Sequence, residues 1–184
     1  MNKYRNCKKI VIIGFTGSGK STLALQLGSI LRIEVFHIAS IMWRPGWVHR
    51  PVSEWKEMLA QIIQKEAWII EGKGKIDIRE VVYDLQFPEA DVIIFLDFPK
   101  SLCLWRICKR SLQYLGKYKP ELSSEYPERF RGSLAKIKRF WKNFERDRLV
   151  TLQKLNDYSV KENQMIIVLK KPSEVRSFLS EVKA

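Results

Sequence analysis

The stretch Gly14-Phe15-Thr16-Gly17-Ser18-Gly19-Lys20-Ser21 constrains the fold of this chain more than any other stretch. It fills every fixed position of the pattern G-x-x-x-x-G-K-[ST]. The run from Lys9 to Ile13 is apolar and β-branched, which is typical of a buried strand. From Ser21 to Leu31 apolar residues recur at helical spacing. The sequence therefore predicts a strand, a glycine loop and a helix in that order.

The residue types in this loop are those that binding of a phosphate chain requires. Gly14, Gly17 and Gly19 reach backbone angles that are closed to residues with a Cβ, so consecutive N–H groups turn inward. The following helix N-terminus adds partial positive charge. Lys20 is expected to reach the β- and γ-phosphates, and the Ser21 hydroxyl to bind Mg²⁺. The loop predicts nucleotide binding.

Length and composition limit the number of domains and the kind of cellular environment that the sequence fits. A chain of 184 residues is expected to form a single domain, residues 1–184, and it has no apolar stretch near the ~18 residues that span a bilayer. No signal peptide is recognisable. Three cysteines without a CxxC motif fit a reducing cytoplasm, and the two histidines have no partner at metal-ligand spacing.

The chain is strongly basic, with a formal net charge of +13. Of this, +9 lies between Phe98 and Arg148, far in sequence from the glycine loop. Such a charge suits nucleic acid, anionic small molecules or a membrane surface.

Five apolar runs alternate with helical patterns along the chain. The predicted strands are residues 9–13, 34–38, 68–72, 91–97 and 165–169. The predicted helices are residues 21–31, 54–66, 77–83, 100–112, 132–156 and 173–182. This alternation predicts an α/β fold, a doubly wound parallel sheet with right-handed crossovers and helices on both faces.

One predicted strand ends in a carboxylate. The run Asp91-Val92-Ile93-Ile94-Phe95-Leu96-Asp97 is almost wholly apolar until Asp97. An acidic strand end accompanies a loop of this kind in nucleoside triphosphatases and orients Mg²⁺ or its water. Asp97 is therefore predicted to join Ser21 at the metal.

The segment Met42-Trp43-Arg44-Pro45-Gly46-Trp47 has two interpretations. It is either a loop anchored by buried tryptophans, or an acceptor pocket in which the rings stack on a planar group while Arg44 holds an anion. The residues alone leave both open.

With these elements placed, the chain resembles the adenylate-kinase-like P-loop kinases and, more closely, the bacterial DNA topology modulation proteins. The resemblance runs over nearly the whole length. It is carried by GFTGSGKST, WRPGW at Trp43 to Trp47, WIIEG at Trp68 to Gly72, DVIIFLD ending at Asp97, Cys103 to Arg110, and the stretch from Gly116 to Glu128.

The resemblance implies a sheet of order 2-3-1-4-5 and transfer of the γ-phosphate of ATP by positioning and charge neutralisation. It implies ATP–Mg²⁺ binding by Gly14, Thr16, Gly17, Ser18, Gly19, Lys20, Ser21 and Thr22. It also implies a mobile lid at about 113–131. The lid cations would be Arg106, Arg110 and Lys119, and Arg79 and Arg44 would face the acceptor.

The chain departs from the family pattern at three positions. Ala39 stands where similar proteins have an Asp after the second strand, Lys73 where Asn follows a glycine, and Lys119 where an Arg precedes a proline. Trp43, Arg44, Lys73 and Arg79 are the candidate acceptor residues.

Three functions follow as hypotheses. The first is an ATP-dependent small-molecule or nucleotide kinase, with a nucleotide and a small acceptor as partners. The second is a nucleic-acid-associated nucleotide-binding protein, in which the basic region from Arg129 to Arg148 faces phosphates. The third is a nucleotide-binding regulator without an acceptor, motivated by Ala39 and Lys73.

Overall fold

The structure is a computed structural model that describes residues 4, 7–44, 48–72, 74, 79–113, 130–158 and 164–184, without the side chains of residues 80 and 130–136. The strands are β1 Lys9–Gly14, β2 Val35–His37, β3 Trp43–Arg44, β4 Val48–His49, β5 Trp68–Glu71, β6 Val92–Leu96 and β7 Met165–Leu169. The helices are α1 Lys20–Leu31, α2 Ile38–Met42, α3 Val52–Ile63, α4 Arg79–Gln86, α5 Lys100–Gln113, α6 Phe130–Asp157 and α7 Pro172–Lys183.

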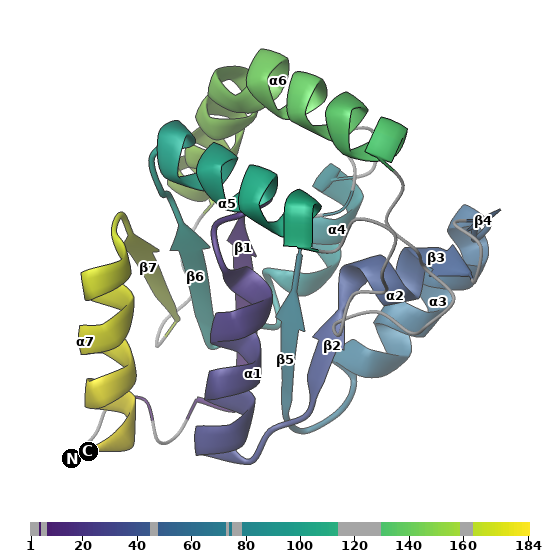
Figure 1. Cartoon of the computed structure of the whole chain (residues 1–184). Helices are drawn as coiled ribbons and strands as arrows, with labels where there is room; N and C mark the ends of the chain where they lie inside the picture. Colours follow the sequence, from purple (N-terminus) through teal and green to yellow (C-terminus); the bar gives the residue numbers. More distant parts are fainter. Residues whose placement is uncertain are drawn as a thin grey trace.

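The centre of the molecule is a five-stranded parallel sheet in the order β2-β5-β1-β6-β7. If the two strands of the short β3-β4 hairpin are left out of the numbering, β5, β6 and β7 become the third, fourth and fifth strands. The observed order is then the predicted order 2-3-1-4-5. Figure 1 shows α1 and α7 in front of the sheet and α4 behind it, while α5 and α6 cross above the carboxyl ends of the strands. The predicted α/β class, with helices on both faces, is confirmed.

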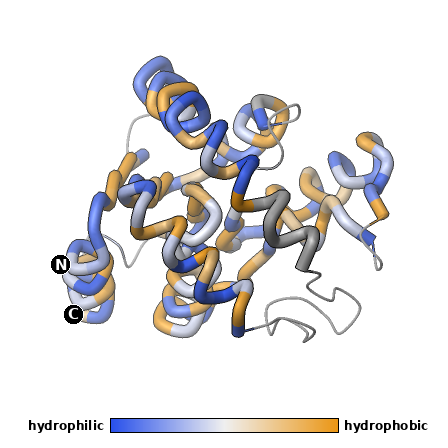
Figure 2. The backbone as a smooth tube through the Cα atoms, turned by 45° about the horizontal axis from the view of Figure 1, so that its top comes forward, coloured by the Kyte–Doolittle hydropathy of each residue, from blue (hydrophilic) through white to orange (hydrophobic). Residues whose placement is uncertain are grey.

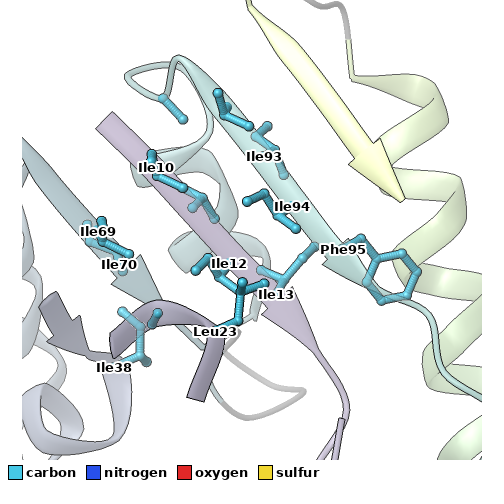
Figure 3. Close-up of a cluster of buried hydrophobic side chains, with 14 of the residues drawn as sticks. Ile10, Ile12, Ile13, Leu23, Ile38, Ile69, Ile70, Ile93, Ile94 and Phe95 are labelled. Carbon is cyan, nitrogen blue, oxygen red and sulfur yellow. The ribbon is translucent and has the colours of Figure 1, made fainter. Parts of the chain in front are cut away.

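The sheet is apolar because its strands are covered on both faces, as parallel sheets are. The residues of β6 are all buried, and so are those of β1 after Lys9. In Figure 3, Leu23 of α1 and Ile38 of α2 lie against Ile12 and Ile13 of β1 and Ile70 of β5. Figure 2 shows that the helices alternate between hydrophilic and hydrophobic stretches, as amphipathic helices packed on a core do.

The contact between α4 and α6 is of a different kind, because it is buried but polar. Arg79, Tyr83 and Gln86 follow one another at helical spacing on α4 and are at most 4% exposed. Arg79 donates a hydrogen bond to Asp147 of α6 at 3.3 Å. Burial raises the pKa of Tyr83 to about 12, and the charge of Arg79 only partly offsets that rise. We call Arg79, Tyr83, Gln86, Asp147 and Thr151 the polar seam.

The long helix α6 carries the aromatic residues of the predicted basic region, and they differ in burial. Phe144 is buried and Phe140 is half-buried, in line with the apolar stripe seen in the sequence. Trp141 of that stripe is instead 59% exposed, with the Lys100 ammonium 4.0 Å from its ring centroid.

Among the described residues, no helix is both long enough and apolar enough to cross a membrane.

Candidate active site

The glycine loop connects β1 to α1 and is packed tightly. Ser18 N–H donates to the Phe15 carbonyl at 3.1 Å, which closes the turn. Gly17 and Gly19 have φ of 83° and 95°, a conformation that glycine adopts most readily. A Cβ on Gly17 would lie 2.4 Å from the Cys103 carbonyl oxygen of α5, so this position has no room for another residue.

The predicted phosphate ligands lie on the first turn of α1, which begins at Lys20. Lys20 Nζ donates to the Phe15 carbonyl at 3.1 Å, across the mouth of the loop. Ser21 Oγ donates to Glu71 Oε1 at 3.2 Å. The helix N-terminus, the Lys20 charge and the Ser21 hydroxyl therefore converge at one place, as a phosphate site requires.

Glu71, which was not predicted as a site residue, is the carboxylate that meets Ser21. It ends β5, is 7% exposed, and its Oε1 lies 2.9 Å from His37 Nδ1 at the end of β2. Burial raises its pKa, but the His37 hydrogen bond, the Lys20 charge and the Ser21 hydrogen bond together outweigh burial and lower it below the ordinary 4.5. Glu71 is therefore ionised at neutral pH. The signal in the sequence was an apolar strand with an acidic end, the same pattern that singled out Asp97.

Asp97 has a different partner. The guanidinium of Arg148 on α6 donates from Nε and Nη2 to its two carboxylate oxygens, each at 2.7 Å. The Asp97 side chain is 2% exposed, and its hydrogen bonds raise the pKa of Arg148. In this structure both oxygens of the predicted metal carboxylate bind an arginine.

Two arginines of α5 face the loop. Arg106 Nη1 donates to the carbonyls of Ser18 at 3.1 Å and Gly17 at 3.4 Å, and its guanidinium lies 5.4 Å from the Phe98 ring centroid. Arg110, one helical turn later, lines the same opening. Both arginines come from α5 itself.

These groups share one cleft of about 480 Å³. Its lining comprises Gly14, Thr16, Gly17, Gly19, Lys20, Ser21, Thr22, Ile38, Ala39, Met42, Trp43, Glu71, Gly72, Gly74, Arg106 and Arg110. The cleft lies at the carboxyl ends of the strands, where ligands bind to open α/β sheets. Of the predicted nucleotide ligands, Ser18 does not line the cleft, and it is 1% exposed.

The structure brings some of the predicted acceptor residues to this cleft and not others. Trp43 lines it. Arg44 is on the adjacent strand position but pairs with Glu54 of α3, with half of its side chain exposed. Arg79 does not face the cleft, because it is 4% exposed within the polar seam and pairs with Asp147. Lys73, Lys119 and most of the predicted lid lie outside the described residues.

The segment before Trp43 forms a single-turn helix, whose first residue, Ile38, was predicted to end the second strand. The strand β2 ends at His37, and α2 follows at once. Trp43 of the aromatic segment is half-buried and packs on the His49 ring, with ring centroids 4.1 Å apart, and it also lines the cleft.

The donor groups in the cleft fit Mg²⁺. The Ser21 hydroxyl and the Glu71 carboxylate are hard oxygen ligands, which this ion prefers, and Mg²⁺ usually takes its remaining ligands from water and substrate phosphates. A lowered carboxylate pKa is what a cation site needs at neutral pH.

Comparisons with known proteins agree on the fold. No protein-family model and no curated protein sequence matches the chain. Among solved structures, the shikimate kinase from Aquifex aeolicus is 21% identical, with a TM-score of 0.52 over 95% of this chain and 96% of that one. The shikimate kinase from Acinetobacter baumannii (12% identical, TM-score 0.51, 97% and 92% covered) and a gluconokinase from Sinorhizobium meliloti (13%, 0.50, 95% and 89%) are also similar.

At such identities the likeness establishes the fold and nothing more. This chain has the fold of the P-loop kinases, a parallel sheet with a glycine loop after its central strand. The DNA topology modulation family, suggested by sequence motifs, is not confirmed by any of these comparisons.

Proposed function

We propose that this protein is an ATP-dependent phosphotransferase that passes the γ-phosphoryl group of ATP to a small acceptor molecule. One observation carries the proposal. The phosphate loop with Lys20 and Ser21 opens into the same cleft as the segment from Ile38 to Trp43, so a nucleotide and a second molecule have adjoining places. A kinase needs this adjacency, because its chemistry consists mainly of positioning and charge stabilisation.

Each charged group then has a role. The loop N–H groups, the start of α1 and Lys20 stabilise negative charge on the transferring phosphoryl group. Arg106 holds the loop by its carbonyls, and Arg110 adds a second cation at the cleft. Ser21 and Glu71 would hold Mg²⁺. When bound, that ion neutralises charge on the phosphate oxygens.

Asp97 has a supporting role in this proposal. Its bidentate pair with Arg148 ties α6 to the carboxyl end of β6, next to the loop. Phe144 of α6 packs on Phe15 of the loop, with ring centroids 4.5 Å apart. The pair therefore stabilises the wall behind the phosphate site.

The nucleic-acid alternative receives no support from the comparisons. The aromatic residues Phe140 and Phe144 of the basic helix are used in packing. The regulator without an acceptor is the competing hypothesis, because Ala39 offers no carboxylate where the proteins that the chain resembles in sequence have one.

The experiment that tests the proposal is ADP formation from Mg–ATP, alone and with a panel of acceptors. The panel holds small hydroxylated metabolites, phosphate esters, and single- and double-stranded DNA. We expect one small acceptor to stimulate turnover, and Lys20→Ala to lower the stimulated rate by about 100-fold or more.

The other outcomes each decide against the proposal. Stimulation by DNA alone would favour the nucleic-acid alternative. Tight ATP binding together with an unresponsive panel would favour the regulator. Activity that survives Lys20→Ala would place the reaction elsewhere in the protein.

A further inference from the structure

Exposed apolar side chains gather on α5 and α6. Among the described residues, the large apolar side chains that are exposed are Trp105, Leu112, Trp141, Leu149 and Val150 on these two helices, and Leu25, Val48, Val52 and Val168 elsewhere. Trp105 and Trp141 are the only exposed tryptophans in the described part of the chain. Tryptophan is usually buried in large part, so two exposed indoles on neighbouring helices indicate a binding surface.

On α6 the exposed apolar residues share one face with cations. Trp141 and Leu149 stand at i and i+8, which places them two turns apart on the same stripe, and both are more than half exposed. Lys138, Lys142 and Glu145 are exposed on that same face. The face is therefore apolar and basic at once, and the described part of this protein does not cover it.

The helix α5 repeats this arrangement on its outer face. Trp105, Lys109 and Leu112 stand at i, i+4 and i+7, and all three are exposed. The Lys109 ammonium lies 5.1 Å from the centroid of the Trp105 ring, as the Lys100 ammonium lies beside Trp141. Figure 1 shows α5 and α6 side by side beyond the strand ends, and the two helices are in contact. We call Trp105, Lys109, Leu112, Lys138, Trp141, Lys142 and Leu149 the α5–α6 surface.

The charge around this surface is positive. The helix α5 contains no acidic residue. The exposed cations of the two helices up to Val150 are Lys109, Lys138, Arg139, Lys142 and Arg146. Between Lys138 and Val150, Glu145 is the only exposed acid. Charge complementarity therefore requires an anionic partner.

The aliphatic residues distinguish between two kinds of anionic partner. A single-stranded nucleic acid uses cations for its phosphates and aromatic rings for its bases, and it has no use for exposed aliphatic side chains such as Leu112, Leu149 and Val150. A lipid bilayer uses all three kinds of residue. Cations attract anionic head groups, indoles lie at the level of the head groups, and leucines enter the boundary of the acyl chains.

We infer that the α5–α6 surface docks this protein on an anionic lipid bilayer. The two helices lie on the bilayer and do not cross it. The inference is independent of the proposed function, because no residue of the α5–α6 surface lines the cleft. The cleft side of α5 carries Arg106 and Arg110, so the helix can serve the phosphate loop with one face and the lipid with another.

The first test is co-sedimentation of the full chain with vesicles. The anionic vesicles are phosphatidylcholine with about one third phosphatidylglycerol, and the neutral vesicles are phosphatidylcholine alone. We expect the partition coefficient to be at least about tenfold higher for the anionic vesicles, and to fall as salt is added. Absence of binding to the anionic vesicles, or equal binding to both kinds, would overturn the inference.

The second test separates docking from simple attraction between charges. The double variant Trp141→Ser with Leu149→Ser keeps every charge and changes only exposed side chains. We expect its partition coefficient on the anionic vesicles to fall by about tenfold. The matched control is Leu25→Ser with Val48→Ser, which removes two residues of similar exposure from α1 and β4 and should leave partition unchanged.

Trp105→Ser on α5 extends the test to the other helix, and it keeps the inference testable if the double variant does not fold. We expect it to weaken partition by about threefold to fivefold. Partition that is unchanged in every folded variant of the α5–α6 surface would overturn the inference, because charge alone would then explain the binding.

Two further measurements identify another occupant. Binding of single-stranded DNA by a protein that does not bind the anionic vesicles would overturn the inference in favour of nucleic acid. Sedimentation velocity of the protein alone reports a second copy. A dimer that Trp141→Ser with Leu149→Ser dissociates would overturn the inference, because a copy of this chain would then cover the surface. A monomer that binds the anionic vesicles more tightly than the DNA would support it.

Discussion

Two buried carboxylates end the strands on either side of β1, and their surroundings differ. Glu71 closes β5 and meets a hydroxyl and an imidazole, with the Lys20 charge nearby. Asp97 follows β6 and is bound through both oxygens by Arg148. A guanidinium is charged at all relevant pH values and neutralises its partner, whereas the neighbours of Glu71 include the hydroxyl expected to bind a cation. The role of an acidic residue at a strand end is therefore defined by its partners and not by its position.

The largest expected effect is that of Glu71→Gln, which replaces the carboxylate by an amide of the same shape. We expect magnesium-dependent phosphoryl transfer to fall about 100-fold, because the cation loses a charged ligand. Calorimetric titration with the nucleotide should show that Mg²⁺ raises the nucleotide affinity of Glu71→Gln less than it raises that of the wild type. Asp97→Asn is the matched variant. If it reduces the magnesium effect as much as Glu71→Gln does, the distinction between the two acids is wrong.

The second prediction concerns stability. Arg148→Met leaves the buried Asp97 carboxylate without its partner, and we expect the free energy of unfolding to fall by about 2 kcal/mol, less than for a fully buried pair because Arg148 is 35% exposed. Denaturant unfolding measures this. Adding Asp97→Asn should recover part of the loss.

The control for that measurement is Arg146→Met, two residues away on the same helix. The Arg146 side chain is 59% exposed, so the change should cost less than about 0.5 kcal/mol. An equal loss in both variants would show that Arg148 acts through the helix surface and not through Asp97.

The third prediction uses the two histidines of the chain. His37→Phe keeps a ring at the end of β2 but removes the nitrogen that holds Glu71. We expect the affinity for Mg–ATP to fall by about threefold to tenfold, since the carboxylate loses one of its two fixed partners. His49→Phe, which keeps a ring against Trp43, is the comparison. If His49→Phe weakens Mg–ATP binding as strongly, His37 does not act through Glu71.

The smallest expected effect is on acid stability. The folded-state pKa of Glu71 lies below its ordinary 4.5, so its contribution to stability is complete above that pH and is lost as the pH falls through the folded value. The wild type should therefore lose more unfolding free energy on acidification than Glu71→Gln does. Parallel losses in the two proteins would mean that the carboxylate is not stabilised by its neighbours.

Much of the fold was predictable because its signals are local. The strand Met165–Leu169 was predicted at its exact bounds, and the other four sheet strands within two residues at either end, since apolar β-branched runs are typical of covered parallel strands. The loop residues from Gly14 to Thr22 follow from a motif whose spacing fixes its geometry.

The predictions that the structure contradicts concern residues whose positions depend on tertiary partners. Ile38 was expected to extend a strand, but that strand ends at His37 and the chain turns directly into α2. Arg79 was expected at the acceptor, yet its partner Asp147 lies 68 residues away on α6. Glu71 and Asp97 have the same local pattern, and their tertiary partners separate them, Ser21 and His37 for Glu71 and Arg148 for Asp97. No period or motif within a short window encodes these pairings.

The polar seam has a consequence for how the molecule opens. The sheet is held by apolar burial, whereas α6 adds charged contacts to the apolar packing of Phe144, through Asp147 to Arg79 of α4 and through Arg148 to Asp97. A buried charged pair has to offset its own desolvation cost, so it contributes less net stability than apolar burial does. In amide hydrogen exchange, α6 should therefore open as a separate cooperative unit at a lower free energy than β1 and β6, and this difference should depend little on salt because both pairs are shielded from solvent.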